Sequence, residues 1–154
     1  MKFGIIKERK NPPDRRVVFT PEELVRLQSE HPEAEIKVES SDIRIFSDDQ
    51  YRNLGLNVTA EMSDCDVLFG VKEVPVDALI PNKKYFFFSH TIKKQPYNRK
   101  LLKAILDKNI ELYDHETIVD ATNHRLIGFG RYAGLVGAYN GFRGFGIKYD
   151  LFTL

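Results

Sequence analysis

The chain has 154 residues, which is enough for one domain with a core of ordinary size, and its composition is that of a globular protein. Its 23 basic and 22 acidic residues nearly cancel, so net charge favours neither nucleic acid nor an anionic membrane as a partner. The longest apolar stretches are too short to span a bilayer. The single cysteine, Cys65, excludes an intramolecular disulfide and suits a reducing cytoplasm.

The predicted elements begin with a β-rich run at residues 2–6, which is too short for the apolar region of a signal peptide. A charged loop follows over residues 7–19. Thr20 predicts the start of a helix, because its side chain can cap the first turn and Glu23 completes a capping box. We expect this helix to end before Pro32.

The middle of the chain predicts three more strands and two short helical segments. Residues 35–39 alternate apolar and polar side chains, as a half-buried strand does. A second capping box at residues 47–50 predicts another helix start. Residues 66–71 and 85–89 are apolar runs typical of strands covered on both faces, and residues 76–80 predict a single helical turn.

The following segments continue the alternation of strands and helices. Residues 96–108 predict a helix, residues 110–113 a strand, residues 120–125 a polar turn and residues 126–129 a last strand. This order indicates an α/β fold with three layers, in which helices cover both faces of a mainly parallel sheet, as in Rossmann-like and flavodoxin-like domains. The apolar face of the helix is predicted at Leu101, Leu102, Ile105 and Leu106.

A segment of helical length at residues 131–149 is rich in glycine, and each interior glycine costs a helix about 0.8–1 kcal/mol relative to alanine. Several share one face, so a close neighbour must offset this cost, either the domain's own sheet or a second domain. We expect residues 1–130 to form a substrate domain. Residues 131–154 are expected to lead toward a dinucleotide-binding domain that the chain lacks, and their apolar end favours truncation. The glycines are Gly134, Gly137, Gly141, Gly144 and Gly146.

Charged residues follow four predicted strands at their carboxyl ends, where open α/β sheets bind ligands. Arginine and lysine suit carboxylates, a lysine among other cations can act as a base, and histidine passes protons near neutral pH. The set therefore predicts a pocket for a polyanionic small molecule. Singly, each lysine could be a solvated loop residue, and His90 a satisfied core histidine. The set contains Lys10, Arg15, Arg16, Lys72, Glu73, His90, Lys93, Asp114, His115 and Glu116.

Three further motifs are weaker candidates. Residues 128–134 are similar to a dinucleotide fingerprint, but the third glycine is one place late and no ribose-binding acid follows, so we reject a nucleotide site there. Residues 114–116 are adjacent on a strand end and cannot all face one metal ion. Cys65 lies in a charged turn without an activating arrangement, and we expect it to be inert.

Four motifs stand in a fixed order, at residues 10–21, 70–73, 88–95 and 129–137. The first two resemble the opening loop and the second signature of the alanine dehydrogenase and transhydrogenase N-terminal domain superfamily. The other two are most similar to its branch of lysine-2-oxoglutarate reductase and saccharopine dehydrogenase. The resemblance extends over essentially the whole chain.

This resemblance implies an NAD(P)-dependent oxidoreductase whose active site lies between a substrate domain and a Rossmann domain that holds NAD or NADP. In that branch, lysine and 2-oxoglutarate condense to an imine that is reduced to saccharopine, or the reverse. The family pattern makes Lys72 the proton-transferring base and gives His90 the proton transfers of carbinolamine formation and imine hydrolysis. The cations implied to hold substrate carboxylates or tune the pKa of the base are Lys10, one of Arg15 and Arg16, and Lys93. The resemblance implies that two acids, Glu73 and Glu116, modulate this cationic cluster and meet the substrate's amino group.

Two alternatives stay open: an alanine dehydrogenase-like enzyme for another amino or keto acid, and a non-catalytic module that binds such acids. The expected partners are a small amino-acid or keto-acid substrate, a dinucleotide-binding domain in cis or in trans, and a second copy of the chain. Neither nucleic acid nor membrane is expected. We expect the 154 residues alone to be inactive and the protein to be cytoplasmic.

Overall fold

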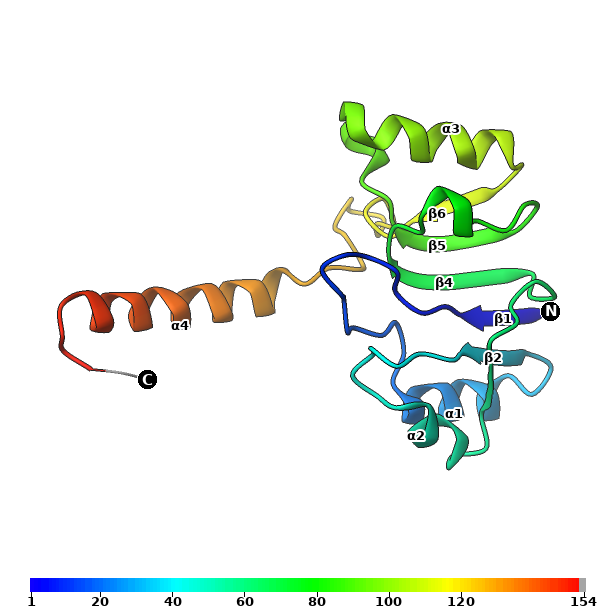
Figure 1. The fold of residues 1–154 in the computed structure, drawn as a ribbon, viewed down its shortest axis with the longest axis horizontal. Coiled ribbons are helices and arrows are strands. Elements are labelled where there is room, and N and C mark those ends of the chain that lie inside the picture. The colour runs from blue at the N-terminus through cyan, green and yellow to red at the C-terminus, as the bar shows by residue number, and fades with distance from the viewer. Residues whose placement is uncertain (153–154) are drawn as a thin grey trace. The chain divides into compact units, whose positions relative to one another are not determined.

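A computed structural model describes residues 1–152, which divide into two units that meet after residue 118 (Figure 1). The first unit contains a sheet of six strands, three α-helices and three single 3-10 turns. The strands are β1 (Lys2–Ile5), β2 (Glu35–Glu39), β3 (Asn57–Thr59), β4 (Val67–Lys72), β5 (Lys84–Phe88) and β6 (Glu111–Asp114). The helical segments are α1 (Pro21–Glu30), α2 (Asp48–Arg52), η1 (Val76–Ala78), η2 (Thr91–Lys93), η3 (Pro96–Asn98) and α3 (Arg99–Asp107).

The sheet is parallel throughout, with the strand order β3-β2-β1-β4-β5-β6. The chain builds outward from β1 to β3 and then returns to the other side of β1 with β4. The direction of winding therefore reverses between β1 and β4. In open α/β sheets a ligand crevice forms at such a switch point, outside the carboxyl ends of the strands.

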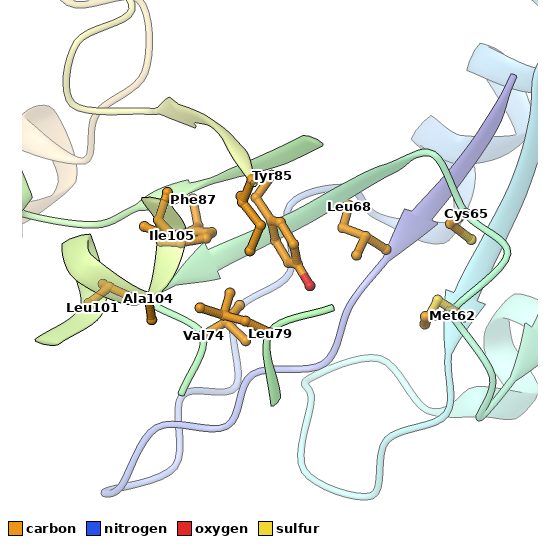
Figure 2. Close-up of a cluster of buried hydrophobic side chains, with 11 residues drawn as sticks. Met62, Cys65, Leu68, Val74, Leu79, Tyr85, Phe87, Leu101, Ala104 and Ile105 are labelled. Atoms are coloured by element: carbon orange, nitrogen blue, oxygen red, sulfur yellow. The ribbon is translucent and has the colours of Figure 1, made fainter. Parts of the chain in front are cut away.

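Each face of the sheet carries its own apolar core, because successive side chains of a strand point to opposite faces. Along β4, Leu68 belongs to the cluster under α3, which Figure 2 shows around Tyr85 and Phe87 of β5. The next residue, Phe69, packs on the opposite cluster, which α1 and α2 cover. Helices thus lie on both faces, and the predicted three-layer α/β fold is confirmed.

Both predicted capping boxes form. The Thr20 hydroxyl accepts from the Glu23 N–H at 3.2 Å, and the Glu23 carboxylate accepts from the Thr20 N–H at 2.8 Å. Ser47 and Gln50 make the same reciprocal pair at the start of α2. Since each box needs only residues three apart, local sequence suffices to specify both helix starts.

Two predictions about elements are wrong, and one strand was missed. Residues 126–129 form no strand: Leu126 is exposed, and within residues 119–152 no strand lies beside this segment to pair with it. The short edge strand β3 was not predicted. In α3 the buried face consists of Leu101, Ala104 and Ile105, while Leu102 and Leu106 are exposed. Each exposed leucine directly follows a buried residue, and one step along a helix turns the side chain away from the buried face.

The second unit contains a polar turn and the long helix α4 (Gly130–Lys148). The predicted turn is present, closed by an antiparallel bridge between Val119 and Arg125. Within residues 119–152, the shared glycine face of α4 meets no neighbour, so the partner expected there stays a prediction. Gly146 is different, because a Cβ there would lie 2.5 Å from the carbonyl oxygen of Phe152, which folds back on the helix. None of the described helices is long and apolar enough to cross a membrane.

Candidate active site

The candidate site lies at the carboxyl ends of β1, β4, β5 and β6. Lys72 is the last residue of β4 and stands opposite Phe88, the last residue of β5, in the register of the sheet. His90 follows two residues after Phe88. The backbone N–H of His115 donates to Phe87 of β5 at 3.2 Å, which places Glu116 at the end of the neighbouring strand. The sheet therefore brings the predicted base, histidine and acid to adjacent strand ends.

The loop after β1 contributes Asp14 and Arg16 beside Lys72. The Arg16 Nε donates to the Asp14 carboxylate at 2.9 Å. The hydrogen-bonding Arg16 guanidinium holds the pKa of Asp14 below its usual range, and the charge of Lys72 adds to this effect. Asp14 was not predicted as a site residue, because one acid in a charged loop carries no pattern that marks it.

The two arginines of this loop have different surroundings. The Arg15 Nε donates to the carbonyl of Ile43 at 3.3 Å, and the Arg15 carbonyl accepts from Ile45 at 2.8 Å, so Arg15 is tied to the segment after β2. Arg16 instead lies by Asp14, and its charge also acts on Glu8 next to β4. The geometry favours Arg16 over Arg15 as the carboxylate ligand.

Lys10 and Glu73 pair across the same edge of the sheet. The Lys10 ammonium lies 2.6 Å from Glu73 Oε1. The other oxygen, Oε2, is buried and accepts no hydrogen bond from any residue that the structure describes. An acceptor in this state suits a donor brought by a ligand, such as a substrate ammonium group.

His90, Lys93 and Glu116 form a second charged group. His90 Nδ1 lies 3.1 Å from Glu116 Oε2, and Lys93 Nζ lies 3.3 Å from Glu116 Oε1. The Glu116 side chain is only 5% exposed, whereas that of Lys93 is 49% exposed. One buried carboxylate thus serves two donors, and it can stabilise a positive charge on the imidazole of His90.

A buried polar network fixes this second group. The Asp114 carboxylate accepts from the Ser89 hydroxyl and, at 2.8 Å, from the backbone N–H of Glu116. His90 has a left-handed backbone with φ of 56°, and its carbonyl accepts from the Asn98 amide at 2.9 Å. Such a backbone costs a non-glycine residue roughly 1–2 kcal/mol and persists when its neighbours hold it in place. Ser89, Asn98 and the role of Asp114 as a support were not predicted.

His115 points away from this group and into the protein. Its Nε2 lies 3.1 Å from the carbonyl oxygen of Gly70, which can only accept, so Nε2 carries the proton. Its Nδ1 is buried and has no hydrogen-bond partner among the described residues. Asp114, His115 and Glu116 thus face different partners.

We predict that His115 makes the fold sensitive to acid. Burial lowers the pKa of its imidazole from the usual value near 6.5, although the nearby Asp114 charge acts in the opposite sense. The unfolded chain therefore binds the proton more readily than the folded one, so stability is complete above pH 6.5 and falls as the pH drops below it. Denaturant melts between pH 7 and pH 5 should show this fall, flattened in His115→Phe.

The matched control is His31→Asn, since the His31 side chain is 60% exposed in the same unit. This variant should keep the acid-side slope of the parent protein. An unchanged slope in His115→Phe would show that other groups cause the acid sensitivity.

Comparison with known proteins identifies the family of the chain. The family described as alanine dehydrogenase/PNT, N-terminal domain, matches residues 4–136. The chain belongs to this family. The predicted superfamily is therefore confirmed, and residues 4–136 include every site residue predicted above.

Curated relatives agree with this membership, and a solved structure shares the fold. Alpha-aminoadipic semialdehyde synthase of Arabidopsis thaliana is 35% identical over 147 residues, which are 93% of this chain and 14% of that protein. Saccharopine dehydrogenase [NAD(+), L-lysine-forming] of Yarrowia lipolytica is 30% identical over 109 residues, 68% of this chain and 30% of that protein. An L-alanine dehydrogenase structure superposes with a TM-score of 0.65 at 22% identity, over 80% of this chain and 35% of that one. The chain thus spans a minor part of each protein.

Proposed function

We propose that this chain is the substrate-side domain of an NAD(P)-dependent amino-acid dehydrogenase that forms or cleaves saccharopine. The observation that carries the proposal is the placement of Lys72 and the His90–Glu116 pair at neighbouring strand ends beside the switch point of the sheet, with Arg16 in the loop that follows β1. The names of the relatives supply the substrate class: they include a semialdehyde synthase and a lysine-forming saccharopine dehydrogenase.

In this proposal the cations hold a substrate with several carboxylates. Saccharopine has three, and a chain with net charge +1 can bind it only through a local cluster. Arg16 has a planar pair of donors, Nε and Nη2, which Asp14 now accepts from and which a substrate carboxylate could take over. Lys10 and Lys93 lie on either side of the strand ends that hold Lys72 and His90, and each is already paired with a carboxylate that a substrate anion could replace.

The proton transfers fall to Lys72 and His90. As lysine adds to the keto carbon of 2-oxoglutarate, Lys72 accepts the proton that the attacking amine must lose. Lys72 passes this proton to the oxygen of the former keto group, which becomes the hydroxyl of the carbinolamine. His90 then donates a second proton to that oxygen, which leaves as water as the protonated imine forms. Glu116, 3.1 Å from His90, stabilises the protonated imidazole that this step requires.

The described residues do not fit a nicotinamide dinucleotide. The glycines at residues 128–134 would need a preceding strand to form a dinucleotide turn, and residues 126–129 are not a strand. We therefore assign the binding of NAD or NADP to a Rossmann domain in cis or in trans. A reducing cytoplasm stays the expected location, and Cys65 is the buried thiol on which this expectation rests.

The test uses the complete gene product and follows nicotinamide absorbance. We expect turnover with lysine plus 2-oxoglutarate, and little with pyruvate plus ammonium. The reverse preference would assign the domain to an alanine dehydrogenase-like enzyme. Saturable binding of 2-oxoglutarate without turnover of either pair would leave a binding module.

A further inference from the structure

Glu8 follows β1 by three residues, is 8% exposed and lies against the end of β4. Its Oε1 accepts from the backbone N–H of Val71 at 2.7 Å, and its Oε2 accepts from that of Lys72 at 2.8 Å. Each oxygen of the Glu8 carboxylate therefore accepts from one backbone N–H at the end of β4. The second of these N–H groups belongs to Lys72, the proposed base. Hydrogen bonds to a charged acceptor are about twice as strong as those between neutral groups.

These bonds stand where the backbone ladder between β1 and β4 stops. The last ladder bond runs from the Ile6 N–H to the carbonyl of Phe69 at 2.9 Å. Beyond it, the pairing of β4 with β5 shifts register between Phe69 and Lys72. Successive N–H groups of a regular strand point to opposite edges, so one carboxylate can accept both only because the strand is irregular here.

Gly70 leaves room for this arrangement. A Cβ at Gly70 would lie 3.1 Å from side-chain carbons of Ile6 and 3.5 Å from Glu8 Oε1. Any larger residue would push against the segment that carries Glu8. The end of β4 is thus irregular in register, lacks a side chain at Gly70 and is held by one carboxylate.

We propose that Glu8 is a positioning residue for Lys72, which it holds at the switch point through the two backbone bonds. This inference rests on the proposed function, in which Lys72 takes the proton of the attacking amine. Burial raises the pKa of the Glu8 carboxyl, and the N–H groups of Val71 and Lys72 act in the opposite sense. Removing one of the two acceptor oxygens of Glu8 would weaken the pair of bonds that holds the backbone of Val71 and Lys72.

The chain contains a matched carboxylate that holds a different segment. Glu39, at the end of β2, is 4% exposed, accepts from the backbone N–H of Lys7 at 2.9 Å and pairs with Arg9. It links the ends of two adjacent strands as Glu8 does, but neither partner is a proposed catalytic group. Glu39→Gln is therefore the control for loss of a buried strand-end carboxylate.

The experiment is a double-mutant cycle in the complete gene product, assayed with lysine, 2-oxoglutarate and NADH or NADPH. Glu8→Gln keeps the size of the side chain but replaces one acceptor oxygen with an amide group that cannot accept. Since a misplacement of about 1 Å can cost about 100-fold in rate, we expect kcat to fall about 10- to 100-fold while KM changes less than about threefold. In the Lys72→Met background, the same change should cost less than about threefold, because the group it positions is gone.

Glu8→Asp provides a second variant, with an intact charge on a side chain one methylene shorter, and thermal melts confirm that each variant folds. We expect Glu39→Gln to lower the melting temperature while kcat stays within about threefold in both backgrounds. Equal losses of kcat from Glu8→Gln with and without Lys72 would mean that Glu8 has a general structural role. This outcome would overturn the positioning role but leave the proposed function in place. Full turnover in Lys72→Met would instead remove the base assignment, and the positioning role with it.

Discussion

Replacing Lys72 with methionine in the complete gene product is expected to lower turnover of lysine plus 2-oxoglutarate by about 10²- to 10⁴-fold, the contribution typical of a general acid or base. Methionine keeps the length and packing of the half-buried lysine stem but cannot accept a proton. Steady-state kcat, followed through nicotinamide absorbance, measures the effect. KM for 2-oxoglutarate should change much less, since the carboxylates are assigned to other cations.

The control for this prediction is Lys100→Met. Lys100 is exposed on α3, and its replacement removes the same charge from the surface. It should leave kcat within about twofold, as surface substitutions commonly have small effects. Wild-type turnover in a folded Lys72→Met protein would exclude Lys72 as the base.

A second large effect is expected at Arg16. Hydrogen bonds to charged groups are worth about 1.5–3 kcal/mol each, so Arg16→Met should lower kcat/KM for 2-oxoglutarate by about 10- to 150-fold. The loss should appear mainly in KM, because the side chain binds substrate and does not transfer a proton. Arg16→Lys should restore only part of it, since an ammonium cannot replace the planar pair of donors.

Arg15→Met separates the two adjacent arginines. Arg15 is held by Ile43 and Ile45 on the far side of β1, and its loss should leave kcat/KM within about threefold. The opposite result, a large loss at Arg15 and none at Arg16, would reverse the assignment. Initial rates over a range of 2-oxoglutarate concentrations, at fixed saturating lysine, distinguish the two.

The elements that sequence predicted well depend on near neighbours in the chain. Thr20 and Ser47 cap their helices through residues three positions away. The convergence of residues such as Lys72 and His90 could be predicted because parallel strands place their carboxyl ends at one edge of the sheet. Periodicity and topology thus predicted most of the fold and the edge of the sheet at which the candidate residues lie.

The parts that sequence missed depend on contacts between distant residues. Glu8 and Val71 are 63 positions apart, and nothing local shows that a glutamate after a strand will bind the backbone of another strand. Asp114 likewise supports Ser89, which follows the neighbouring strand β5. The false strand at residues 126–129 had the right composition, but a strand also needs a partner, which composition does not reveal.

The buried carboxylates after β1 and β2 have a consequence for protein engineering. Glu8 binds the backbone of β4, and Glu39 of β2 binds the backbone of Lys7, so the segment after β1 is held to both neighbouring strands before the loop of residues 10–16 begins. These bonds between the strands do not involve that loop. A grafted loop of different length and charge could alter which acid enters the crevice while Lys72 and His90 stay on their strand ends. Substrate choice and proton transfer would then be open to separate directed evolution.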